Sequence, residues 1–335
     1  MTTPGTNGRI DVVGIGNALV DVLSKVTDDF LNENGVDKGV MTLIDTARAA
    51  ELYGRMGAAT EISGGSGANT IAGLAGLGAT AAYVGKVKDD QLGRIFAHDI
   101  RALGAGFDTP LAPPETEIET GRCLVLVSPD GERSMNTYLG VSEALGPNDI
   151  DPDLMARADW LYLEGYRFDG AASHEAFAKA IDATKAAGGR CSVTLSDPFC
   201  VDRHRDAFRH MIAADIDLLF ANEHEIVSLY QASDLDAALR ACAGDVSFAA
   251  ITVGERGAMV IEEGVIRHVP TDPVEIVDAT GAGDLFAAGF LHALCRGADA
   301  VDAAHLGSAC AGAVISHMGA RSEADLKALA AARGF

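Results

Sequence analysis

Residues 278–291 (DATGAGDLFAAGFL) join a polar, glycine-broken turn to an apolar segment of small residues, with a carboxylate at the junction. Unpaired N–H groups at a helix start, together with the helix dipole, form a site for an anion. Gly281 and Gly283 carry no Cβ atom and let a ligand approach the backbone closely. Asp284 beside such a site could accept a proton from a nucleophile that attacks a phosphoryl group. Taken alone, an Asp after a glycine turn is more often a helix cap, so other motifs must decide.

Two polar residues follow the first apolar segment, residues 10–15. Asn17 and Asp21 come after this expected strand, at the strand end where open α/β sheets bind ligands. Asp21 could accept hydrogen bonds from two hydroxyls of a sugar, and the alternative is an acid in a turn. Residues 14–16 (GIG) start like a dinucleotide fingerprint, but its third glycine is missing, which argues against a Rossmann site.

A second glycine-rich motif, residues 64–69 (GGSGAN), precedes a helix expected over 70–77. Gly64 and Gly65 would allow close backbone approach, and Asn69 could reach a hydroxyl. The alternative is a flexible loop with a helix cap. The chain contains no P-loop sequence, so phosphate chemistry would depend on the turn before Asp284.

Asn222 and Glu225 follow another apolar strand with i, i+3 spacing, which places them on one helix face. This pair suits Mg²⁺ held through its water ligands, because Mg²⁺ keeps much of its hydration. The alternative is an N-capping Asn beside a surface Glu. Residues 252–257 (TVGERG) form a weaker signal, a strand-end turn that could border a nucleotide.

The elements that must position these residues alternate between strand and helix. Apolar strands alternating with helices predict one doubly wound α/β domain with a mostly parallel sheet, covered by helices on both faces. The expected strands lie at 10–15, 81–84, 160–163, 191–195, 218–220 and 249–253. The turn chemistry near 121–133 predicts a hairpin. Because the segments 22–45 and 117–140 do not fit the α/β layer, we expect them to form a small β lid on a single domain that spans 1–335.

The composition excludes several classes of function. The chain has 335 residues, 48% of them hydrophobic, and a formal net charge of −22, which argues against disorder and against nucleic-acid binding through a basic surface. Its six cysteines show no CxxC spacing and are expected to be reduced, buried thiols. We expect a cytoplasmic protein without a membrane partner, because neither a signal-peptide pattern nor an apolar run of spanning length occurs.

Taken together and in this order, the motifs resemble those of the PfkB/ribokinase-like carbohydrate and nucleoside kinases over nearly the whole chain. Residues 64–69 are similar to the N-terminal signature of that family and residues 278–291 to its C-terminal signature. Asn222-x-x-Glu225 looks like its magnesium-associated motif. The resemblance implies a ribokinase-like fold and phosphoryl transfer from ATP, with Mg²⁺ as a cofactor.

The resemblance also implies roles for individual residues. The catalytic group contains Asp284 as base, the amides of Ala282, Gly283 and Asp284 as anion hole, Gly281 in the same turn, and the lid residue Arg133 on the donor phosphates. Substrate hydroxyls would be held by Asn17, Asp21, Gly64, Gly65, Ser66 and Asn69. ATP and its Mg²⁺ would be bordered by Asn222, Glu225, Thr252, Gly254 and Gly257. A monovalent cation, K⁺, would lie near Asp278 and Thr280, although residues 319–322 (GARS) lack the Pro-Ser ending of ribokinases.

The acceptor is less closely specified than the reaction. Residues 16–21, the lid end around Arg133 and residues 195–199 look more like adenosine kinases than ribokinases or fructokinases. Tyr166 and Phe199, both expected just past strand ends, could border a purine, and the alternative is core packing. The leading prediction is phosphorylation of a nucleoside 5′-hydroxyl, adenosine first. A sugar kinase for ribose, fructose or a related sugar is second, and a non-catalytic nucleoside or sugar sensor is third. The sequence leaves both monomer and homodimer open.

Overall fold

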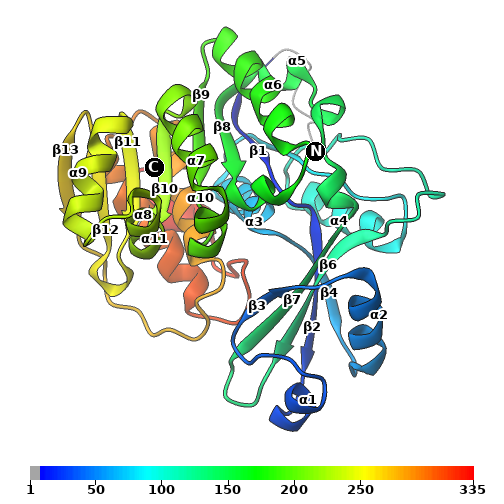
Figure 1. Ribbon diagram of the computed structural model, residues 1–335. Helices are drawn as coiled ribbons and strands as arrows, with labels where there is room; N and C mark the ends of the chain where they lie inside the picture. Colours follow the sequence, from blue (N-terminus) through cyan, green and yellow to red (C-terminus); the bar gives the residue numbers. More distant parts are fainter. Residues whose placement is uncertain (1–7) are drawn as a thin grey trace.

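An eight-stranded sheet forms the centre of the molecule (Figure 1). Its strands are β1 (Ile10–Ile15), β5 (Ala81–Val84), β8 (Ala158–Glu164), β9 (Arg190–Thr194), β10 (Leu218–Asn222), β11 (Phe248–Thr252), β12 (Ala258–Glu262) and β13 (Val265–Val269). The computed structural model describes residues 8–335. The strand order is β13-β12-β11-β10-β9-β8-β1-β5, parallel from β5 to β11 and antiparallel at β12 and β13. The predicted doubly wound, mostly parallel sheet is confirmed.

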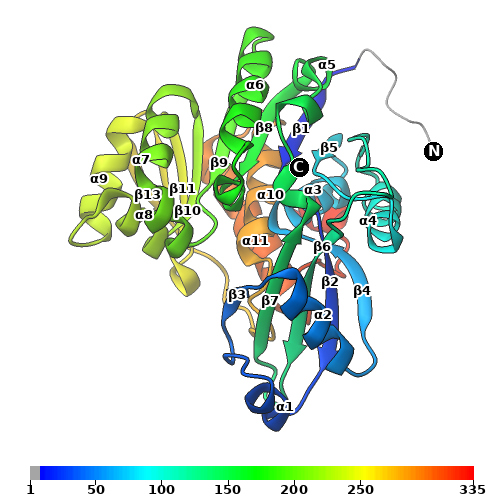
Figure 2. The ribbon, with the colours of Figure 1, turned by 45° about the vertical axis from the view of Figure 1, so that its right-hand side comes forward.

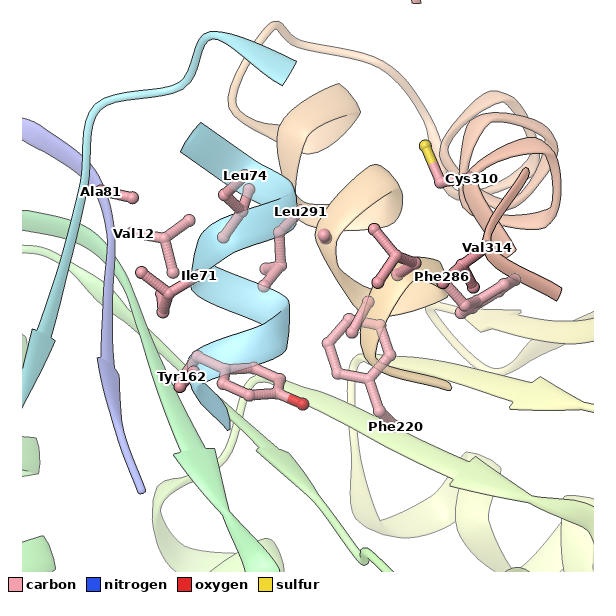
Figure 3. Close-up of a cluster of buried hydrophobic side chains, with 14 of the residues drawn as sticks. Val12, Ile71, Leu74, Ala81, Tyr162, Phe220, Phe286, Leu291, Cys310 and Val314 are labelled. Atoms are coloured by element: carbon pink, nitrogen blue, oxygen red, sulfur yellow. The ribbon is translucent and has the colours of Figure 1, made fainter. Parts of the chain in front are cut away.

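Helices cover both faces of this sheet. One face packs against α3 (Ser66–Leu77), α4 (Gln91–Ala102), α10 (Ala282–Leu294), α11 (Ala300–Ile315) and α12 (Leu326–Ala331). The other packs against α5 (Pro152–Met155), α6 (Ser173–Ala186), α7 (Pro198–Asp215), α8 (Glu223–Tyr230) and α9 (Leu235–Asp245). Successive side chains of β8 point to opposite faces of the sheet and therefore pack into two different hydrophobic cores. Tyr162 packs into the core on the α3 and α10 face, and Leu163 packs into the core on the α6 and α7 face. Figure 3 shows part of the first cluster, with Ile71 and Leu74 of α3, Leu291 of α10 and Tyr162 of β8.

A separate five-stranded sheet stands at one end of the main layer (Figures 1 and 2). Its strands are β2 (Leu19–Lys25), β3 (Met41–Leu43), β4 (Thr60–Gly64), β6 (Thr120–Val127) and β7 (Arg133–Gly140), in the order β3-β7-β6-β2-β4. The short helices α1 (Asp28–Glu33) and α2 (Thr46–Arg55) accompany it. The segments 22–45 and 117–140 supply strands to this sheet, which we call the lid. The lid also includes β4, a strand that the sequence analysis did not assign to it.

The chain passes between the main layer and the lid at a few tight junctions. Asn17 lies between β1 and β2, and Gly65 lies between β4 and α3 with a φ of 96°. A Cβ atom on Gly65 would lie 2.3 Å from the carbonyl oxygen of Asn17, so only glycine permits this approach. This turn starts α3 at Ser66, earlier than the predicted residue 70, and places Asn69 inside the first turn of the helix. Within residues 8–335, none of the helices combines the length and apolar character needed to cross a membrane.

Candidate active site

A cleft of about 810 Å³ lies between the lid and the carboxyl ends of the parallel strands. Neighbouring strands of the main sheet contribute residues at or just past their ends: Asn17, Glu164, Thr194, Asn222 and Thr252. The lid contributes Asp21 and Arg133, and the turn before α10 closes the cleft. Such a position, outside the carboxyl ends of the strands, is where open α/β sheets bind ligands.

The turn before α10 presents open amides to the cleft. Gly281 has a φ of 79°, and a Cβ atom there would lie 2.5 Å from the Ala320 carbonyl oxygen, so the turn requires glycine. Within residues 8–335, the amides of Gly281, Gly283 and Asp284 have no hydrogen-bond partner. The Ala282 amide, by contrast, donates to the Ala279 carbonyl at 3.3 Å. The predicted anion hole of Ala282, Gly283 and Asp284 is therefore corrected at Ala282, whose amide is already engaged.

Asp284 stands at this helix start and faces α3. Its Oδ1 accepts a hydrogen bond from the Ser66 hydroxyl at 2.6 Å, and its Oδ2 accepts one from Asn69 Nδ2 at 3.0 Å. Burial raises the pKa of Asp284 to about 6, although the bonds from Ser66 and Asn69 and the charge of Arg321 oppose the rise. The carboxylate is thus oriented by two donors, and its raised pKa would suit a general base.

Asp21 is a second carboxylate in the cleft. It lies on β2 and pairs with Ile62 of β4. Its carboxyl group reaches the neighbouring Gly64, where a Cβ atom would be only 2.3 Å away. Gly64 thus makes room for Asp21 and does not itself line the cleft. Burial raises the pKa of Asp21 to about 6; Arg321 and Arg133 lower it, and Asp284 raises it further. With Asn69 and Ser66 beside it, Asp21 completes a polar wall suited to hydroxyl groups.

Asn17 belongs to a buried network that the sequence analysis missed. Its Nδ2 donates to Glu164 Oε1 at 3.1 Å, and its Oδ1 accepts from Arg167 at 2.9 Å and from the Ser142 hydroxyl at 2.9 Å. Glu164 Oε2 also accepts from the Gly67 amide at 2.7 Å, at the start of α3. Burial raises the pKa of Glu164 to about 7. The only sequence signal was an acid ending an apolar strand.

Arg133 and Asp278 connect the lid to the main layer. Arg133 Nη2 lies 2.7 Å from Asp278 Oδ2, and both side chains are buried. Asp278 also accepts bonds from the Thr280 amide and hydroxyl and from the Gly319 amide. Burial would raise the pKa of Asp278, but the bonds from Thr280 and Gly319 and the charge of Arg133 lower it. In this arrangement the Asp278 carboxylate is paired with Arg133, and a K⁺ site near Asp278 and Thr280 stays a prediction.

Asn222 and Glu225 form a capping box at the start of α8. Asn222 Oδ1 accepts from the Glu225 amide at 2.9 Å, and Glu225 Oε2 accepts from the Asn222 amide at 2.9 Å. Both residues also line the cleft, and burial raises the pKa of Glu225 to about 7. Residues 8–335 contain no group of three His, Cys, Asp or Glu side chains suited to a metal. A lone carboxylate fits Mg²⁺ only through water and the phosphates of a bound nucleotide.

The remaining predicted residues divide into two groups. Thr252 and Tyr166 line the cleft, whereas Gly254 and Gly257 do not. Gly257 has a φ of 93°, and a Cβ atom there would lie 2.2 Å from the Val269 carbonyl oxygen, so its role is in the turn. Phe199 is 74% exposed on the first turn of α7 and does not line the cleft, so it forms no aromatic pair with Tyr166. Asp197 caps this helix, since its Oδ1 accepts from the Cys200 amide at 2.6 Å.

Besides Asp21 and Arg133, the lid contributes a group of apolar side chains to the cleft. They come from β2, β3, β6 and β7: Leu19, Met41, Leu43, Cys123, Met135 and Leu139. They adjoin the polar wall of Asp21, Ser66 and Asn69. This end of the cleft is therefore amphipathic.

Comparison with known proteins identifies this arrangement. The family model for pfkB family carbohydrate kinases matches residues 36–327. The chain belongs to the pfkB family of carbohydrate kinases. It is a phosphotransferase with an alcohol acceptor, in the ribokinase-like fold of this family.

Individual members of the pfkB family that resemble the chain differ in their acceptors. The ATP-dependent ribose-1-phosphate kinase of Halopiger xanaduensis is 32% identical over 90% of this chain and 96% of that protein. The structure of a probable sugar kinase from Rhizobium etli is 44% identical, with a TM-score of 0.91 over 98% of this chain and 99% of that chain. The structure of adenosine kinase from Sinorhizobium meliloti is also 44% identical, with a TM-score of 0.90 over 97% and 99% of the two chains.

Proposed function

We propose that this kinase transfers the γ-phosphoryl group of ATP to the 5′-hydroxyl of a nucleoside, and that adenosine is its preferred acceptor. The observation that carries the proposal is the amphipathic acceptor end of the cleft. Asp21 and Asn69 suit the hydroxyls of a ribose, while the apolar lid face suits the flat surface of a base. The 44% identity to the Sinorhizobium meliloti adenosine kinase over nearly the full chain supports the same acceptor.

The charges in the cleft argue against an acceptor that already carries a phosphate. Within residues 8–335, Arg133 is the only Lys or Arg that lines the cleft, and it is paired with Asp278. A sugar phosphate would place its negative charge near Asp21 and Asp284 without a free cation to balance it. A neutral sugar or nucleoside encounters no such penalty.

In the proposed reaction, Asp284 orients the acceptor hydroxyl and takes its proton. The hydroxyl oxygen bonds to the γ-phosphorus, the bond to the leaving ADP oxygen breaks, and the proton passes to the Asp284 carboxylate. The transition state is loose, so alignment and charge stabilisation contribute more than strong basicity. Ser66 and Asn69 supply the alignment, because they hold both oxygens of the base.

Open amides and cations would stabilise the transferred group. The amides of Gly281 and Gly283 lie beside Asp284 and lack partners within the described residues, and each such donor can contribute about 10²–10³ in rate. Arg133 would turn from Asp278 toward the donor phosphates once they bind. Mg²⁺ on those phosphates would supply further charge neutralisation, with Glu225 and Asn222 holding its water ligands. Thr252 and Tyr166 border the remaining space.

A panel of acceptors tests this proposal. Purified protein with ATP and Mg²⁺ is offered adenosine, other nucleosides, ribose, fructose and ribose 1-phosphate, and ADP release is measured for each. We expect adenosine to give the highest kcat/KM. Turnover of ribose or fructose with adenosine inert would establish the sugar kinase instead. Binding of adenosine without any ADP release would indicate a non-catalytic sensor.

A further inference from the structure

Arg321 is a half-buried cation beneath the acceptor end of the cleft. It lies between α11 and α12, directly after Ala320, whose backbone packs against the Gly281 turn. Its Nε donates a hydrogen bond to Asn69 Oδ1 at 3.2 Å. Its Nη2 is buried and has no hydrogen-bond partner within residues 8–335. Burial lowers the pKa of Arg321, and nearby acids oppose this change, so the guanidinium stays charged.

The contact with Arg321 fixes which way the Asn69 amide points. A guanidinium can only donate and an ionised carboxylate can only accept, so Asn69 Oδ1 must face Arg321 and Nδ2 must face Asp284. A flipped amide would oppose donor to donor on one side and acceptor to acceptor on the other. Arg321 thus acts on Asp284 through Asn69 and does not itself line the cleft.

Arg321 also balances an excess of negative charge. Asp21 and Asp284 repel one another, and Arg321 is the largest charge that opposes the rise in pKa of either. The other titratable groups near this set are Arg133 and Cys123 of the lid, Tyr83, Asp99, Tyr162, Glu164 and Tyr166. Most of these groups are acidic or neutral, so Arg321 is the cation on which Asp284 depends.

We propose that Arg321 is a positioning residue for phosphoryl transfer, which locks the Asn69 amide and keeps Asp21 and Asp284 ionised. The proposal rests on the proposed function in that Asp284 is the base. Beyond that function, we infer that Arg321, in the segment between α11 and α12, sets the pH range in which Asp284 is ionised.

Two substitutions separate charge from geometry. In Arg321→Met the charge and the Asn69 contact are both lost, and we expect the acid midpoint of kcat/KM to rise by about one pH unit or more. Activity at pH values below that midpoint then falls about tenfold, and much of it returns at pH 9. In Arg321→Lys the charge remains, so the midpoint stays within a few tenths of a unit while KM for the acceptor rises severalfold. Arg267→Met, at a surface ion pair on β13, is the matched control.

An NMR titration provides a readout that does not depend on turnover. Protein with ¹³C-labelled aspartate carboxyls is titrated from pH 4 to 9, and Asp284→Asn assigns the Asp284 resonance. We expect the Asp284 midpoint to rise in Arg321→Met and to remain unchanged in Arg321→Lys and in Arg267→Met. Thermal melting verifies that each variant is folded. An unmoved Asp284 midpoint in a folded Arg321→Met protein would overturn the proposal. If wild type phosphorylates no acceptor, the proposed function fails while this titration still tests Arg321.

Discussion

Replacing Asp284 with Asn removes the proposed base while keeping its shape. The Asn carbonyl can still accept from Asn69 Nδ2, and its amide can donate to the Ser66 hydroxyl, so the side chain keeps both partners. We expect kcat to fall by about 10²–10⁴, the usual contribution of a general base. Acceptor affinity should change by less than about tenfold, the worth of one neutral hydrogen bond.

The pH dependence of the wild-type enzyme provides a second test of the role of Asp284. With a pKa of about 6, Asp284 is roughly nine-tenths ionised at pH 7 and one-tenth ionised at pH 5. Wild-type kcat/KM for the acceptor should therefore rise about tenfold between these pH values, because kcat/KM reports the free enzyme and the ionised form is the active one. ADP release measures kcat, and calorimetry measures acceptor binding. A variant with kcat within threefold of wild type at pH 8, or one that loses binding alone, would refute the role of Asp284.

Three further substitutions probe the elements around the base. Arg133→Ala should lower kcat/KM for ATP about 10²-fold, because it removes the lid cation and leaves Asp278 buried without its partner; unchanged ATP kinetics would contradict this role. Glu225→Gln should raise the free Mg²⁺ needed for half-maximal ADP release by about tenfold, and an unaltered Mg²⁺ curve would exclude the proposed water-mediated contact. Gly281→Ala should lower the free energy of unfolding in urea by about 1–2 kcal/mol or more, since φ is 79° and a carbonyl oxygen lies 2.5 Å from the new Cβ. Gly244→Ala is the control, because Gly244 lies within α9 and a Cβ atom there would meet no neighbouring atom. This substitution should not lower the free energy of unfolding.

The sequence was most informative where local pattern decides structure. Apolar runs bounded by Gly and polar turns predicted the central strands, and the hairpin chemistry near 121–133 predicted β6 and β7. Asp21, Asn69 and Asp284 were predicted to act together and do meet in one cleft. Each lies beside a glycine-containing junction, and such junctions are visible in the sequence.

The parts that sequence did not reveal depend on contacts between distant segments. Arg321 follows α11 and reaches Asn69, which is more than 250 positions away in the chain, so no local pattern announces it. Glu164 directly follows the strand expected at 160–163, and only the fold brings Asn17 to it. Phe199 was expected near the acceptor because it follows a strand. However, Asp197 caps α7, and Phe199 stays 74% exposed.

The identity of the phosphorylated product tests the central claim most directly. One reaction vessel contains equimolar adenosine, ribose and fructose with Mg²⁺ and ATP labelled at its γ-phosphate, and the labelled products are separated by chromatography. The proposed function predicts that the label accumulates in adenosine 5′-monophosphate, and that Asp284→Asn removes this signal. Label found in ribose or fructose phosphate, with none in the nucleotide, would contradict it.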